Sequence, residues 1–144
     1  MFAVALAFTC TLAAQERGNW RAVSSNARAI TSDISLAAEK IQIGFTAFPI
    51  SWIRPLQPAE LKAAFVFDGD SAGTGSLYKL NIPATQKFLK KNSLCGADDT
   101  QWMVSYLAGR ELQIAFFSGS KVPDLTPEAI ANTTNLCGVY TYVK

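Results

Sequence analysis

Apolar and polar residues alternate with a period of two along most of the chain after residue 14. In residues 40–48, Ile41, Ile43 and Phe45 alternate with polar or small residues. This period places successive side chains on opposite faces of an extended chain and predicts a half-buried β-strand. Similar alternation, or short apolar runs bounded by turn residues, predicts further strands over residues 20–24, 29–36, 61–67, 78–82, 101–107, 111–118 and 138–143.

Signals for helices are few. Thr126 precedes Pro127 and Glu128, and this combination of N-cap, proline and early acid predicts a short helix that runs to Asn132. A second helical turn is expected within residues 85–91. Residues 49–58 contain three prolines and are interpreted as a loop over a barrel mouth. The pattern predicts a mostly β fold: a small antiparallel barrel or sandwich of roughly seven or eight strands, with one or two short helices.

The first fourteen residues differ from the rest of the chain. Residues 2–14 are uncharged and apolar, are too few to cross a bilayer as a helix, and end in small residues before polarity rises at Gln15. They predict a signal peptide over residues 1–14 and a single β-rich domain over residues 15–144. No Lys or Arg precedes the apolar run, although a signal peptide normally has one there. The alternative is a buried N-terminal strand or helix.

The cysteine count supports export. Removal of residues 1–14 takes Cys10 away and leaves one pair, Cys95 and Cys137. In an oxidising compartment this pair would close a loop of roughly 40 residues, which contributes about 4 kcal/mol in the chain-entropy model. Two reduced core cysteines in a cytosolic protein are the alternative. We expect a disulfide, a periplasmic or secreted location, and no membrane span once the signal peptide is removed.

Composition excludes several classes of function. The chain of 144 residues has 17% charged residues and a formal net charge of +2, and its basic residues are scattered. Nucleic-acid binding is not expected, because phosphate neutralisation needs a basic stripe. The chain has no histidine, and two cysteines alone cannot complete a structural zinc site. Asp68 and Asp70 begin like a calcium loop, but Ala72 and Lys79 stand where that loop needs acids. No metal and no cofactor are expected.

One short motif resembles a catalytic site. Gly69, Ser71 and Gly73 fit the G-x-S-x-G nucleophile elbow of esterases, where a strand-to-helix turn exposes the serine to a histidine base. The chain has no histidine, and the segment after Gly73 predicts a strand. We interpret the segment as a glycine-rich turn, and a serine hydrolase using Ser71 is the alternative function.

Aromatic side chains are the remaining candidates for a binding surface. Trp52 and Arg54 lie in the proline-rich residues 48–55, which carry more apolar surface than a solvated loop should. Phe116 and Phe117 are adjacent in a predicted strand and must face opposite sides, so one is exposed unless a second layer covers it. The glycine-rich loop with Asp70 and Ser71 is a second candidate surface.

Two resemblances add to these residues. The segments Trp20-Arg21-Ala22-Val23-Ser24, Asn92-Ser93-Leu94-Cys95-Gly96 and Leu136-Cys137-Gly138-Val139-Tyr140 resemble small exported hypothetical proteins of α-proteobacteria, which implies an envelope or secreted location and no activity. Thr74-Gly75-Ser76-Leu77-Tyr78 is similar to the S-G-x-x-Y loop of the membrane-bound and periplasmic lysozyme inhibitors, which are small disulfide-closed barrels. By that analogy Tyr78 joins the candidate binding residues.

The sequence therefore predicts an exported, non-catalytic binding module of the cell envelope. Its partner is expected to be a protein or a small ligand, with an inhibitor role as one form of this function. The candidate binding residues are Trp52, Arg54, Asp70, Ser71 and Tyr78.

Overall fold

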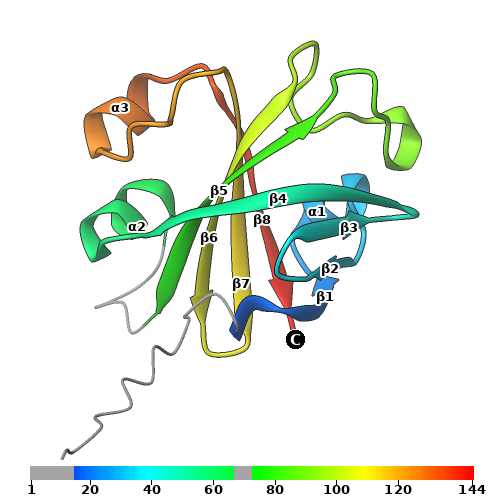
Figure 1. Ribbon diagram of the computed structural model, residues 1–144, viewed down its shortest axis with the longest axis horizontal. Coiled ribbons are helices and arrows are strands. Elements are labelled where there is room, and N and C mark those ends of the chain that lie inside the picture. Colours follow the sequence, from blue (N-terminus) through cyan, green and yellow to red (C-terminus); the bar gives the residue numbers. More distant parts are fainter. Residues whose placement is uncertain (1–14, 67–72) are drawn as a thin grey trace, which may run out of the picture.

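The computed structural model describes residues 15–66 and 73–144. Within them, eight strands are joined by three short α-helices and one 3-10 turn (Figure 1). The strands are β1 (Gly18–Ala22), β2 (Ile34–Leu36), β3 (Lys40–Ile43), β4 (Thr46–Pro55), β5 (Thr74–Ile82), β6 (Thr100–Ala108), β7 (Glu111–Ser118) and β8 (Leu136–Val143). The helices are α1 (Ser25–Ile30), α2 (Pro58–Ala64) and α3 (Pro127–Asn132), and the 3-10 turn is η2 (Leu89–Lys91).

The strands form a closed antiparallel barrel in which each strand pairs with its neighbours in sequence. β1 closes the barrel on β8, with Arg21 opposite Val143 and Ala22 opposite Tyr142. The predicted β-rich fold is confirmed, and of the two architectures expected the chain adopts the barrel. Closure through β1 and β8 leaves the wall continuous except where a strand is shorter than its neighbour.

The inner faces of the strands form the main core. Inward-facing side chains from the strands pack together there, among them Ile41, Leu80, Met103, Ile114 and Tyr142. All five are nearly or fully buried. In a barrel of eight strands the interior is just wide enough for side chains or one small ligand, and over most of its length this interior is filled by side chains.

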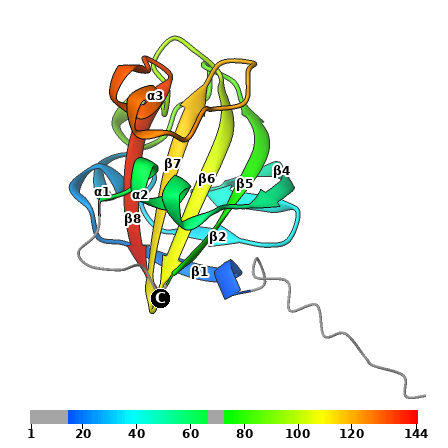
Figure 2. The ribbon, with the colours of Figure 1, turned by 90° about the vertical axis from the view of Figure 1, so that its left-hand side faces the viewer.

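A second apolar layer covers the outer face of β5 to β7. Figures 1 and 2 show α2 and α3 on the same side of these strands, and Leu61 of α2 packs with Leu77 and Val104 of the sheet beneath it. Phe116 faces the inner core and Phe117 the outer layer, and both are buried. The adjacent phenylalanines thus point to opposite sides, and the second layer buries the outer one.

Helix α2 replaces a predicted strand. The apolar run over residues 61–67 predicted a strand, but Pro58–Ala64 is helical. Pro58 occupies the first turn, where its missing N–H costs nothing, and Gln57 and Glu60 cap the N-terminus reciprocally. Ser24 similarly caps α1, which takes up the first part of the strand predicted over residues 29–36. The capping residues decided these two segments, and the period of the apolar residues did not.

Strand β4 replaces the predicted proline-rich loop. Pro49 lies opposite Lys40 of β3, and Pro55 lies opposite Ser76 of β5. The strand predicted over residues 40–48 is instead two strands joined by a tight turn. Gly44 adopts a φ of 61°, which suits glycine, and Phe45 next to it is fully exposed at the tip.

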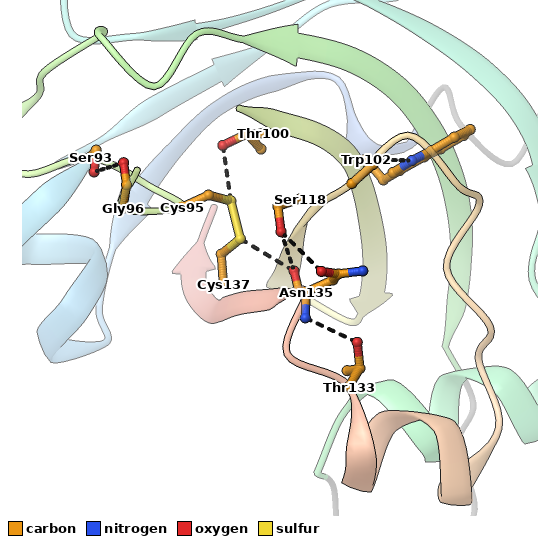
Figure 3. Close-up of a disulfide and its surroundings, with 10 residues drawn as sticks. Ser93, Cys95, Gly96, Thr100, Trp102, Ser118, Thr133, Asn135 and Cys137 are labelled. Atoms are coloured by element: carbon orange, nitrogen blue, oxygen red, sulfur yellow. Dashed lines mark hydrogen bonds between the residues drawn. A yellow bond between two sulfur atoms is a disulfide. The ribbon is translucent and has the colours of Figure 1, made fainter. Parts of the chain in front are cut away.

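The disulfide between Cys95 and Cys137 is present, as predicted (Figure 3). It ties the loop before β6 to the beginning of β8 across a sequence separation of 42. Thr100 on β6 donates a hydrogen bond to the Cys95 sulfur at 3.1 Å. Helix α3 begins after Thr126, and β6 and β7 pair as an antiparallel hairpin over the two strands predicted at residues 101–107 and 111–118.

Candidate functional site

One end of the barrel interior is polar. Ser76 and Tyr78 of β5 lie on the inward face together with Leu80, because residues two apart on a strand share a face. On β6, Ser105 lies directly opposite Ser76, and the Ser76 main-chain N–H donates to the Ser105 hydroxyl at 3.1 Å. We call Ser76, Tyr78 and Ser105 the hydroxyl floor. Each is no more than 5% exposed.

The side chain of Glu16 rests on the hydroxyl floor. Ser105 donates to one carboxylate oxygen at 2.6 Å, and Tyr78 donates to the other at 2.7 Å. The indole N–H of Trp20 donates to the Glu16 main-chain carbonyl at 2.7 Å. Glu16 precedes β1 and is only 2% exposed, so the turn that carries it closes this end of the barrel.

Burial sets the electrostatics of this cluster. It raises the pKa of Glu16 above its ordinary value of 4.5, against the smaller opposing effect of the hydrogen bonds from Ser105 and Tyr78. Burial and the neighbouring carboxylate raise the pKa of Tyr78, so its phenol stays protonated and remains a donor. The Tyr78 phenol therefore remains available as a donor to Glu16 at neutral pH.

Trp52 connects the hydroxyl floor to the surface. Its indole N–H donates to the Ser76 hydroxyl at 3.1 Å, and 49% of the residue is exposed. The hydrogen bond fixes the orientation of a ring that would otherwise lose rotamer freedom on binding a partner. The ring borders a shallow groove of roughly 500 Å³ lined by Ala38, Glu39, Pro49, Ile50, Ser51 and Trp52.

The groove lies where β3 ends and β4 continues. β3 pairs with β4 only as far as Pro49, and the Ile50 N–H then donates to the Glu39 carbonyl at 2.9 Å. From Ser51 to Pro55, β4 pairs with β5 on one edge, and no strand among the described residues pairs with the other. Main-chain groups alternate between the two edges, so those of Trp52 point to the same side as those of Ile50, toward the open edge.

Arg54 lies on the other face of the wall. The pairing of β4 with β5 shifts register between Trp52 and Arg54, and Arg54 reaches Glu60 of α2 with two hydrogen bonds of 2.8 and 2.7 Å. This pairing lowers the pKa of Glu60. The structure thus places Tyr78 in the hydroxyl floor, Trp52 against it, and Arg54 on the outer face in a bidentate ion pair.

The other two candidate residues, Asp70 and Ser71, lie outside the described residues, as does most of the G-x-S-x-G segment. The hydrolase hypothesis therefore stays a prediction. Within residues 15–66 and 73–144, no group of three or more Cys, Asp or Glu side chains is arranged to hold a metal ion. In the same part of the chain, no helix has the length and apolar character needed to span a membrane.

Sequence reasoning missed Glu16 and Ser105. Ser105 carried a readable signal, because it shares the inward face of a predicted strand with Met103 and Leu107, where an apolar residue is expected. Glu16 carried none, since it lies in a short polar stretch and its contact with Ser105 spans 89 positions. Comparisons with protein-family models, curated proteins and solved structures found no match.

Proposed function

We propose that this protein is a non-catalytic binding module of the cell envelope, which holds an extended segment of a partner protein along the open edge of β4. The observation that carries the proposal is the fixed, half-exposed ring of Trp52 beside unpaired main-chain groups. An extended peptide supplies N–H and C=O groups at the spacing that a sheet edge requires, and its side chains fill adjacent pockets.

The shape of the edge favours a short peptide over a second copy of the barrel. The register shift after Trp52 bends β4, and Pro55 lacks an N–H, so the edge is open over only a few residues. Both features limit strand pairing between copies of a protein. Ile53, the next residue along β4, is 46% exposed and adds apolar area to this part of the strand. The Cys95–Cys137 disulfide is compatible with an oxidising compartment.

Peptide selection tests this proposal. Random peptides displayed on phage are selected on the wild-type protein, and a selected peptide is synthesised and titrated by calorimetry. Trp52→Ala is expected to weaken binding by about tenfold or more, as for a central aromatic contact. Val122→Ala is the matched control, because Val122 is equally exposed in the segment between β7 and α3, and the dissociation constant of this variant should equal that of the wild type.

Main-chain pairing is tested on the peptide itself. N-methylation of residues whose N–H faces β4 should abolish binding, and methylation of the intervening residues should not. Failure to select any peptide, or equal affinity for wild type and a folded Trp52→Ala variant, would contradict the proposal.

A further inference from the structure

Glu16 is held in the barrel as a ligand would be held. Its carboxylate comes from the turn before β1, whereas the hydroxyls that bind it, Ser105 and Tyr78, belong to β6 and β5 of the wall. Both carboxylate oxygens accept a hydrogen bond. The carboxylate lies at the polar end of the interior, where the Trp20 indole donates to the Glu16 main-chain carbonyl and the Trp52 indole donates to the Ser76 hydroxyl.

Ser105 has contacts that hold it in place independently of the carboxylate, and Tyr78 extends from the neighbouring strand β5. Ser105 is held by the Ser76 N–H across the β5–β6 ladder, and Ser76 in turn accepts from the Trp52 indole. None of these contacts involves Glu16. Such a pair of preorganised donors on rigid strands is a recognition site for an anion with two oxygens.

We propose that Ser105 and Tyr78 form a carboxylate-binding site inside the barrel, that Glu16 is its resident occupant, and that a small monocarboxylate takes the same place when Glu16 is removed. Within residues 15–66 and 73–144, the carboxylate oxygens accept hydrogen bonds from the Ser105 and Tyr78 hydroxyls and from no cation, so the site selects by shape and by hydroxyl donors. Ligands are limited to short, flat carboxylates because side chains fill the rest of the interior.

Atom counting identifies the probe. Replacing Glu16 with Ala keeps the β-carbon and removes one methylene and the carboxylate, which together have the size of acetate. Acetate should therefore fit the vacated space, formate should fit loosely, and butyrate should be too long. An apolar wall with two hydroxyl donors gives chloride no equivalent pair of contacts.

The three tryptophans report on binding in the full-length Glu16→Ala variant. The indole N–H groups of Trp20 and Trp52 lie at the site, whereas that of Trp102 donates to the Gly119 carbonyl in the outer layer. In ¹⁵N–¹H spectra, acetate is expected to shift the Trp20 and Trp52 indole signals saturably and to leave that of Trp102 unchanged. Acetate should also raise Tm relative to sodium chloride of equal ionic strength.

Two controls separate this site from general salt effects. Glu60→Ala removes a glutamate from the outer face, and acetate should not raise its Tm above the chloride value. Ser105→Ala added to Glu16→Ala removes a donor, and the acetate response should weaken at least several-fold. An acetate response that is absent, that is matched by butyrate, or that survives loss of Ser105 would overturn the proposal.

If Glu16→Ala is unfolded in chloride, recovery of the native indole signals becomes the readout. Recovery in acetate and not in chloride supports the site, because binding to the folded state shifts the equilibrium toward it. Absence of recovery at the highest soluble acetate concentration would contradict it.

Discussion

One glutamate lies against each face of the wall formed by β4 to β6, and the pKa values of the two are shifted in opposite directions. Glu16 lies inside the barrel with hydroxyl partners and a raised pKa. Glu60 lies outside, is paired with Arg54, and has a lowered pKa. The inner carboxylate is costly to ionise because burial removes its solvent, whereas the outer one is stabilised by a cation at the edge of solvent. The same residue type therefore acts as a buried hydrogen-bond acceptor at the inner face and as one partner of a surface ion pair at the outer face.

The largest effects on stability are expected for substitutions that remove a buried phenylalanine from the inner or the outer face of the wall, and they test whether the two faces contribute equally. Phe116→Ala opens a cavity in the inner core, and Phe117→Ala opens one in the outer layer. Each should lower the free energy of unfolding by about 3–5 kcal/mol, because both rings are buried. Urea denaturation measures the two values. A Phe117→Ala cost below about 1 kcal/mol would mean that α2 and α3 cover the barrel only loosely.

The next effect concerns the hydroxyl floor. Tyr78→Phe removes one of the two donors and leaves a buried carboxylate oxygen unsatisfied, which should cost about 2–3 kcal/mol at a pH above the folded pKa of Glu16. The cost should be smaller at acid pH, where Glu16 is protonated in the folded protein. Tyr142→Phe is the control, since the buried Tyr142 hydroxyl bonds to the uncharged Thr31 hydroxyl at 2.7 Å. Equal costs at both pH values would argue that the phenol does not serve the carboxylate.

The strand pattern predicted the barrel wall better than it predicted the helices that cover the wall or the polar end of the interior. Alternation located β5, a run of β-branched and aromatic residues located β8, and paired cysteines located the disulfide, because each depends on residues close in sequence or on simple counting. The run over residues 61–67 was misassigned because a short apolar segment fits a buried strand and a buried helix equally well. Only the capping residues Gln57 and Glu60 distinguish the two.

The candidate site was only partly predictable. Trp52 and Tyr78 could be singled out as aromatic residues, but the hydrogen bond from Tyr78 to Glu16, and the chain of bonds from Trp52 through Ser76 and Ser105, depend on barrel closure. Closure brings the turn before β1 against Tyr78 and Ser105, which lie 62 and 89 positions further along the chain, and no local pattern encodes those distances.

A smaller effect follows from the raised pKa of Glu16. Because its folded pKa lies above the unfolded value of 4.5, Glu16 contributes stability that is fully present below pH 4.5 and is lost as pH rises through the folded pKa. The difference in unfolding free energy between wild type and Glu16→Gln should therefore fall as pH rises from 4 toward 7. Urea denaturation across this range measures it. A difference that grows with pH would mean that the hydroxyl donors outweigh burial.

The smallest effect is expected for the outer glutamate, with the opposite sign. The folded pKa of Glu60 lies below 4.5, so its pairing with Arg54 contributes stability above pH 4.5 that is lost as pH falls through the folded pKa. Glu60→Gln should cost about 0.5 kcal/mol at neutral pH, since Arg54 is well exposed and solvent screens the pair.

This cost should disappear at acid pH and shrink in high salt, whereas the pH-dependent contribution of Glu16 should resist salt because its carboxylate is buried. Parallel denaturation series of Glu16→Gln and Glu60→Gln, at low and high sodium chloride, check the contrast. Equal salt sensitivity of the two variants would show that solvent reaches both faces of the wall. The distinction between Glu16 as a buried acceptor and Glu60 as a partner in a surface ion pair would then fail.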